Sequence, residues 1–284
     1  MQHFAGTAPA PKDKIGTVLD QFDLEKRLPV GRMGVEVHLY STIGSTNDRA
    51  AELAEDGAPE GALVLADEQT AGRGRLGRKW RTPRGSGIAM SLVMRPSQME
   101  ATALGAMGLV GALATIDALA GLKLEPRLKW PNDVLLEGRK VAGVLAEASW
   151  SGPALDYVVL GIGVNVKPVP PDNKAGFDYP STSVEDSVGA TVDRGPLVFS
   201  IVAGVDDWYE RLRSGEAHPA WEERLAYKSE WVTLTNGEEE VTGRPIGLTE
   251  SGGLRLETAE GEELAFEAGS YQLRPMGTDQ LKPN

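Results

Sequence analysis

Residues 62–94 read ALVLADEQTAGRGRLGRKWRTPRGSGIAMSLVM. The apolar runs 62–67 and 88–94 are short and bounded by glycine or polar residues, which predicts two buried strands joined by a long loop. No acidic residue occurs between Gln69 and Met99, although the whole chain is acidic. Six cations fall within twelve positions of the loop: Arg73, Arg75, Arg78, Lys79, Arg81 and Arg84. The stretch therefore predicts a sheet that carries a cationic, anion-binding loop.

Like charges packed this closely repel one another, so we expect the loop to be mobile until an anion orders it. Its glycines permit positive φ and a close approach of the backbone to that ligand. Charge alone leaves open the alternative of a solvated basic loop without a ligand.

The loop nearly matches two nucleotide-binding motifs. Gly72, Gly74 and Gly77 satisfy GxGxxG, but the proline and glycines of residues 83–87 leave no room for the helix that this fingerprint opens. A P-loop needs serine or threonine after its lysine, where this chain has Trp80. Both interpretations fail, so we expect the loop to bind an anion by another geometry.

Three other segments are weak signals when each is taken alone. KWPND at 129–133 and GRKVAG at 138–143 lie at turns between apolar runs, where a lysine is usually just solvated. GIGVN at 161–165 ends an apolar run with two glycines and an amide. Glycine within a strand often marks a close approach of a ligand or another backbone.

The rest of the chain predicts an α+β fold. Strands are expected at 35–40, 127–130, 134–136, 141–148 and 157–166, and helices at 49–55, 101–122 and 196–214, with Ser45–Asp48 capping the first helix. From about Glu230, short β-like runs at 231–235, 240–241, 254–257 and 264–266 are separated by glycine turns. That pattern is typical of a small barrel of roughly 50 residues.

Composition excludes several classes of function. The formal net charge of −12 argues against a general nucleic-acid binder. With no cysteine, disulfides, thiolate metal sites and a cysteine nucleophile are excluded. His3, His38 and His218 have no metal-ligand spacing. The N-terminus does not resemble a signal peptide, and Asp117 makes 101–122 a core helix and not a membrane span, so we expect a cytoplasmic protein with no membrane partner.

Taken in this order, the motifs resemble those of the biotin protein ligase family. The resemblance rests on Ser45-Thr46-Asn47, on Gln69 ahead of GRGRLGRKW, and on KWPND, RKVAG and GIGVN, and it covers roughly residues 35–170. It implies a mixed sheet with flanking helices, a class II synthetase-like catalytic domain, followed by a small C-terminal SH3-like β-barrel. We expect an N-terminal extension at 1–34, partly flexible, the catalytic domain at 35–228 and the barrel at 229–284.

The resemblance also implies roles for individual residues. The biotin-binding set would be Ser45, Thr46, Asn47, Gln69, Arg73, Gly74, Arg75, Lys140, Gly143, Gly161 and Gly163. The set for ATP and the adenylate would be Arg75, Lys79, Trp80, Asn132, Lys140 and Asn165. Lys140 and Arg75 would be catalytic, and Asp133 is a candidate Mg²⁺ ligand. The loop 167–181 should fold over the nucleotide, but its sequence departs from the family pattern and no residue there is assigned.

Such an enzyme activates biotin with ATP and Mg²⁺ and then transfers it to a lysine of a biotin carboxyl carrier domain, with no tightly bound prosthetic group. Two anions must meet in the first step, which explains the need for cations. About 34 residues precede the first expected strand, too few for a DNA-binding repressor domain, so no nucleic-acid partner is expected. The oligomeric state and the identity of the acceptor stay open.

Two other functions compete with this interpretation. A lipoate–protein ligase shares the implied fold and adenylation chemistry but lacks the GRGRxGRxW loop. A nucleic-acid-binding module could combine the basic loop with the C-terminal barrel, but only Trp80 supplies an aromatic side chain in the loop and the net charge opposes it.

Overall fold

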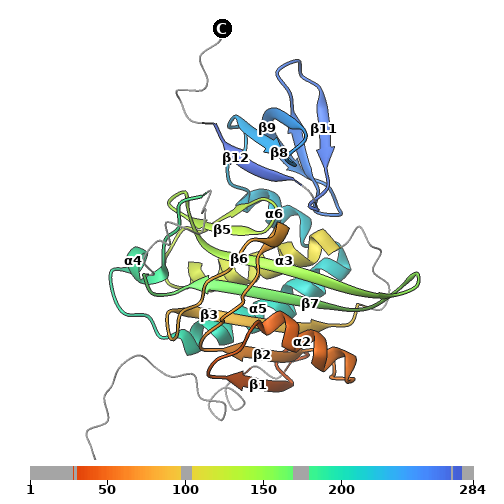
Figure 1. Ribbon diagram of the computed structural model, residues 1–284. Coiled ribbons are helices and arrows are strands. Elements are labelled where there is room, and N and C mark those ends of the chain that lie inside the picture. The colour runs from red at the N-terminus through yellow and green to blue at the C-terminus, as the bar shows by residue number, and fades with distance from the viewer. Residues whose placement is uncertain (1–27, 29–30, 97–103, 169–178, 270, 277–284) are drawn as a thin grey trace, which may run out of the picture.

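The computed structural model describes residues 28, 31–96, 104–168, 179–269 and 271–276 (Figure 1). Seven strands form a main sheet in the order β1-β2-β3-β7-β6-β5-β4. β1 and β2 are parallel, and the other neighbouring strands are antiparallel. The strands are β1 (Glu36–Tyr40), β2 (Ala62–Ala66), β3 (Gly87–Met94), β4 (Arg127–Lys129), β5 (Asp133–Leu136), β6 (Arg139–Ser151) and β7 (Ala154–Asn165). The sheet is therefore mixed, as predicted.

Helices cover both faces of the main sheet (Figure 1). α3 (Leu104–Ala120) and α5 (Arg194–Ser214) pack on one face, and α2 (Thr46–Glu55) packs on the other. Shorter helical segments are η1 (Arg75–Gly77), α4 (Val184–Val188) and α6 (His218–Arg224). Because side chains alternate along a strand, Ile88, Met90 and Leu92 of β3 enter the large core, whereas Val93 packs under α2.

The start of α2 differs from the predicted one. The helix begins at Thr46, and Ser45 occupies the N-cap position without a side-chain capping bond. Thr46 and Asn47 are buried, and their polar atoms bond to groups outside the helix. The prediction of a run of capping oxygens ahead of a helix at 49–55 is therefore wrong, because tertiary partners take up these side chains.

The other two predicted helices agree better with the structure. α3 falls within the predicted 101–122, whose first three residues lie outside the described part of the chain. α5 starts two residues before the predicted 196–214. Asp193 caps it by accepting a hydrogen bond of 3.0 Å from the backbone N–H of Gly195.

Five antiparallel strands form a C-terminal sheet in the order β11-β10-β9-β8-β12, drawn in blue above the main sheet in Figure 1. They are β8 (Val232–Thr235), β9 (Glu240–Leu248), β10 (Leu254–Glu257), β11 (Glu263–Phe266) and β12 (Gln272–Pro275). β9 is longer than its sequence pattern predicts because it pairs with both β8 and β10. β12, which the sequence analysis missed, pairs with β8. The outcome is a mixed α+β fold with an additional antiparallel sheet.

Trp130 joins the two sheets. Its side chain is fully buried, and its indole Nε1 donates a hydrogen bond of 3.0 Å to the carbonyl oxygen of Gly252, in the turn between β9 and β10. Trp130 therefore ties the end of β4 to the C-terminal sheet through one polar contact inside an apolar core.

We expect Trp130→Phe to lower the free energy of unfolding by about 1–3 kcal/mol, because it leaves the buried Gly252 carbonyl without its donor. Denaturant-induced unfolding measures the change. Trp150→Phe is the matched control, since Trp150 is 40% exposed and a change there should be within about 0.5 kcal/mol. Equal stabilities for the two variants would contradict the proposed tie.

Within the segments that the structure describes, no helix combines the length and the apolar character that a membrane crossing demands.

Candidate active site

A cavity of about 290 Å³ opens on the α2 face of the main sheet and extends to the C-terminal sheet. Every residue that the sequence analysis assigned to the site lines it: Ser45, Thr46, Asn47, Gln69, Arg73, Gly74, Arg75, Lys79, Trp80, Asn132, Asp133, Lys140, Gly143, Gly161, Gly163 and Asn165. The tertiary structure thus brings together side chains from segments far apart in the chain. Their placement is observed; their individual roles stay predictions.

One end of the cavity carries a cluster of uncharged polar side chains. Gln69 Oε1 accepts hydrogen bonds from the backbone N–H of Thr46 at 2.8 Å and from its hydroxyl at 3.1 Å. The buried Ser91 hydroxyl oxygen on β3 lies 2.8 Å from Thr46 Oγ1 and 2.6 Å from Asn47 Oδ1. The start of α2 is thereby fastened to β3 through side chains, which holds several donors and acceptors in fixed positions.

Acidic residues surround this polar end. Asn47 Nδ2 donates to Glu147 Oε2 at 2.6 Å, and Arg73 lies 3.2 Å from both oxygens of Glu147. Arg73 also pairs with Asp48 at 2.5 Å, and that hydrogen bond raises the pKa of the guanidinium. Arg73 is therefore oriented by carboxylates from α2 and β6 and does not project freely into solvent.

Glycines form the floor between the two ends of the cavity. Gly143, Gly161 and Gly163 lie on neighbouring β6 and β7, with Gly143 directly opposite Gly163. A Cβ at Gly161 would lie 2.1 Å from Asn47 Oδ1, and a Cβ at Gly163 would lie 2.4 Å from the Trp80 ring. Only glycine permits this close approach of side chains to the sheet.

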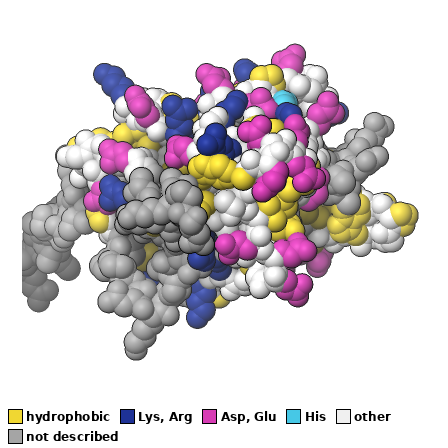
Figure 2. Space-filling view, turned by 90° about the horizontal axis from the view of Figure 1, so that it is seen from above, with side chains coloured by type: hydrophobic (Ala, Val, Ile, Leu, Met, Phe, Trp, Pro, Cys, Tyr) yellow, Lys and Arg dark blue, Asp and Glu magenta, His cyan; other side chains and the backbone are white. Residues whose placement is uncertain are grey.

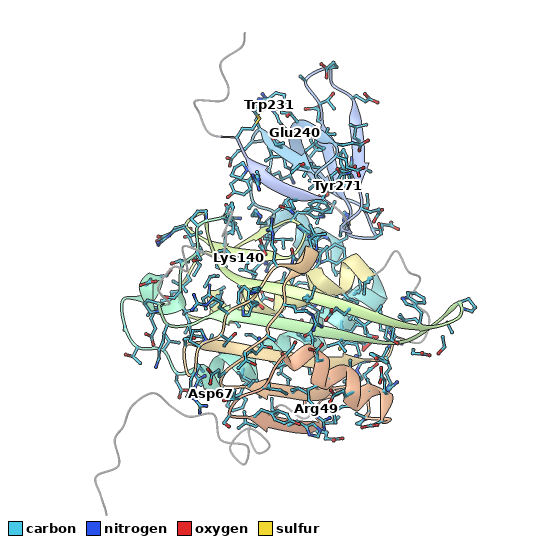
Figure 3. All side chains as sticks on the ribbon, viewed as in Figure 1. Arg49, Asp67, Lys140, Trp231, Glu240 and Tyr271 are labelled. Carbon is cyan, nitrogen blue, oxygen red and sulfur yellow. The ribbon has the colours of Figure 1, made fainter. Side chains whose placement is uncertain are left out.

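The other end of the cavity is cationic. Lys140 Nζ lies 2.5 Å from Asp133 Oδ1, and Lys129 Nζ lies 3.3 Å from Asp133 Oδ2 (Figure 3 labels Lys140). Burial alone would raise the pKa of the Asp133 carboxyl, but the two ammonium groups outweigh it and hold that pKa below its usual range. Burial lowers the pKa of Lys129, and the attraction of Asp133 offsets this only in part. The cluster carries one net positive charge.

This environment does not suit the predicted Mg²⁺ ligand. Both Asp133 oxygens already face ammonium groups, and a divalent cation placed there would be repelled by two positive charges. Among the described residues, no group of three or more histidine or acidic side chains could hold a metal ion. Asp133 therefore does not fit a resident metal ion.

The cationic loop at residues 72–86, ahead of β3, is called the arginine loop, and the C-terminal sheet holds part of it. Arg75 donates to the carbonyl oxygens of Ala268 and Gly269, the latter at 3.0 Å, and to Asn132 Oδ1 at 3.3 Å. Burial lowers the pKa of its guanidinium. Arg78 donates to Gln272 on β12. The repulsion predicted among these arginines is therefore offset by carbonyl and carboxylate oxygens that other elements bring to the loop.

Several lining or supporting residues were missed at the level of sequence. Ser91 could have been found, because it is the polar residue in an otherwise apolar strand. Lys129 belongs to a quoted motif but received no role. Glu147 and the C-terminal residues 272–274 approach the cavity only through the tertiary fold, so no local signal marks them.

Two family models match the chain. The Biotin/lipoate A/B protein ligase family covers residues 39–165, and the Biotin protein ligase C terminal domain covers residues 230–274. The biotin–[acetyl-CoA-carboxylase] ligase of Paracoccus denitrificans is 40% identical over 78% of this chain and 93% of its own length. The enzyme of the same name from Mycobacterium tuberculosis is 31% identical over 91% of this chain and 97% of its own length. The structure of Aquifex aeolicus biotin protein ligase in complex with biotin and ATP superposes with a TM-score of 0.73, at 30% identity, over 85% of this chain and all of that one.

The family model that matches residues 39–165 places the mixed sheet and its cavity in the class of biotin and lipoate ligases. The match to the Biotin protein ligase C terminal domain and the two relatives narrow this class to biotin ligases. The chain belongs to the biotin protein ligase family.

Proposed function

We propose that this chain activates biotin with ATP, forming biotinyl-5′-adenylate and pyrophosphate, and then transfers biotin to a lysine of a carrier domain. The observation that carries the proposal is one cavity with uncharged hydrogen-bonding side chains at one end and a cationic cluster at the other, and with a glycine floor between them. Biotin has the matching polarity, with a neutral ureido ring at one end and a carboxylate at the other.

In the first step a biotin carboxylate oxygen attacks the α-phosphorus of ATP, and the bond to the pyrophosphate leaving group breaks. Thr46, Asn47 and Gln69 would pair with the ureido group, whose burial without partners costs about 1–3 kcal/mol per group. Lys140 would lie between the carboxylate and the α-phosphate, where its charge offsets their repulsion and stabilises the charge that develops at phosphorus. Mg²⁺ would arrive bound to the triphosphate as part of that substrate.

In the second step the neutral amine of the acceptor lysine attacks the acyl carbon, AMP leaves with the bonding electron pair, and the amine loses a proton. The arginine loop, with Arg73, Gly74 and Arg75, would cover the adenylate and exclude water until the acceptor arrives. Lys79, Trp80, Asn132 and Asn165 would contact the nucleotide. No covalent enzyme intermediate is needed.

We assign the main-sheet region at 35–228 to a class II synthetase-like catalytic domain and 229–284 to an SH3-like barrel. The acceptor would be the biotin carboxyl carrier domain of a carboxylase, in line with the names of the relatives. Figure 2 shows acidic side chains with lysine and arginine between them on the face seen from above. The net charge of −12 favours a protein acceptor over nucleic acid.

Exchange of labelled pyrophosphate into ATP tests the proposal. Exchange should require biotin, and lipoate should not replace it. Equal stimulation by lipoate would favour a lipoate ligase, and exchange without either acid would overturn the adenylation step.

We expect Arg75→Gly to speed the loss of the adenylate roughly tenfold to hundredfold, the range for removing a buried, charged hydrogen-bond donor. Release of radiolabelled adenylate from the purified complex measures the rate. Arg255→Gly is the matched control, because Arg255 pairs with Glu263 on the surface of the C-terminal sheet. Unchanged retention by the Arg75 variant would contradict closure of the loop.

A further inference from the structure

Lys129 is a buried cation that has no role in the reaction proposed above. It is 7% exposed at the end of β4 and lines the cavity. Its ammonium lies 3.3 Å from Asp133 Oδ2 and 4.6 Å from the centre of the Tyr179 ring. Burying a lysine is costly, and burial lowers its pKa here, so a side chain of this kind calls for a physical explanation.

Lys129 and Lys140 share one carboxylate but differ in freedom. Each ammonium faces a different oxygen of Asp133. The Lys129 side chain is 9% exposed, whereas that of Lys140 is 26% exposed and lies 5.5 Å from the Trp80 ring. Lys140 is therefore the partner with room to move into the cavity, and Lys129 is the partner that stays.

The shared carboxylate creates a problem for the reaction. To reach a substrate anion, Lys140 must release Asp133, and a buried carboxylate left without a partner is strongly unfavourable. If Asp133 had no other counter-ion, it would compete with the substrates for Lys140. Lys129 removes that competition, because Asp133 keeps one ammonium group when Lys140 leaves.

We propose that Lys129 is the permanent counter-ion of Asp133, a positioning residue that lets Lys140 exchange this carboxylate for the anionic substrates. The inference rests on the proposed function, because it concerns the same adenylation step. In the free enzyme, Asp133 would hold Lys140 in an ion pair until the substrates bind. Lys129 itself touches neither biotin nor ATP in this scheme.

Steady-state pyrophosphate exchange by Lys129→Met tests the inference. The variant leaves Asp133 with Lys140 as its counter-ion, so kcat should fall about tenfold to hundredfold. This is less than the full cost of breaking a buried ion pair, because Asp133 keeps one ammonium group in the free enzyme. The KM for biotin should change by less than about threefold, because the uncharged end of the cavity is untouched. Lys129→Arg, which keeps the charge, should recover most of the loss.

The decisive arm is the double variant Lys129→Met with Asp133→Asn. Without the carboxylate, nothing retains Lys140, so exchange should rise at least about tenfold above that of the single Lys129→Met variant. A purely structural role for Lys129 predicts the reverse, since the second change would add damage. A double variant no faster than Lys129→Met overturns the inference, as does a single variant with the kcat of the unmodified enzyme.

Thermal unfolding and biotin calorimetry on each variant show whether the fold survives. Should Lys129→Met not fold, Lys129→Gln offers Asp133 a neutral donor and takes its place in both comparisons. Lys228→Met, at an exposed lysine outside the cavity lining, is the matched control. Failure of the unmodified enzyme to exchange pyrophosphate with biotin would refute the proposed function itself, a result distinct from any outcome with the variants.

Discussion

Replacing Lys140 with alanine is expected to lower the rate of biotin-dependent pyrophosphate exchange by roughly a hundredfold to a thousandfold, the range for removing one preorganised donor from a developing anion. Two anions meet in the adenylation step, and Lys140 is the cation at the cationic end of the cavity with room to reach them. Exchange kinetics at saturating biotin and ATP measure the loss.

The same variant should stay folded, because Asp133 keeps Lys129 as its partner at 3.3 Å. Thermal unfolding is therefore expected to change little, and biotin should still bind in calorimetry through the uncharged end of the cavity. Lys228→Ala, at an exposed lysine outside the cavity lining, is the control. Near-normal exchange by Lys140→Ala would remove Lys140 from the chemistry.

Gly161→Ala is expected to weaken biotin binding by roughly tenfold to hundredfold, as for the loss of one or two buried hydrogen bonds. The new Cβ would lie 2.1 Å from Asn47 Oδ1 and 2.9 Å from its Cγ. Asn47 cannot move aside without breaking its bonds to Ser91 and Glu147, at 2.6 Å each. Calorimetric titration with biotin measures the change.

Gly108→Ala is the matched control for that substitution. Gly108 lies in α3, where an added Cβ would have no neighbour within 4 Å beyond the chain segments next to it. Alanine there should leave biotin binding unchanged and stabilise the helix by about 0.5–1 kcal/mol. If both glycine variants bind biotin like the unmodified enzyme, the close contact between Gly161 and Asn47 is not what shapes the site.

Much of the site could be predicted because its motifs are local and chemically distinctive. The arginine loop without acidic residues is a signal in its own right, whereas KWPND and GIGVN became informative only together with it, through their resemblance to motifs of the biotin protein ligase family. The sequence pattern also located most strands, since each buried strand is a short apolar run with clear ends. The predicted strands at 141–148 and 157–166 start later than β6 and β7 do, and the first also ends earlier. Backbone pairing between β6 and β7 continues into the polar residues at the tip of the hairpin.

The helix start at Thr46 shows where local rules fail. Residues 45–48 carry side chains that commonly cap helices, yet Thr46 and Asn47 bond to Gln69, Ser91 and Glu147. Those partners lie on or beside other strands, so no rule about neighbouring residues could have found them.

By itself the sequence predicted an anion-binding arginine loop and excluded cysteine chemistry, because cation spacing, glycine positions and the lack of cysteine are properties of the chain. The adenylation chemistry and the roles of single residues were implied by the resemblance of its motifs to the biotin protein ligase family. Only the tertiary structure decided how the charges are balanced. Arg73 faces Asp48 and Glu147, Arg75 faces carbonyl oxygens of the C-terminal sheet, and Asp133 holds two lysines. Electrostatic energy depends on distance in space and on burial, and neither is a function of separation along the chain.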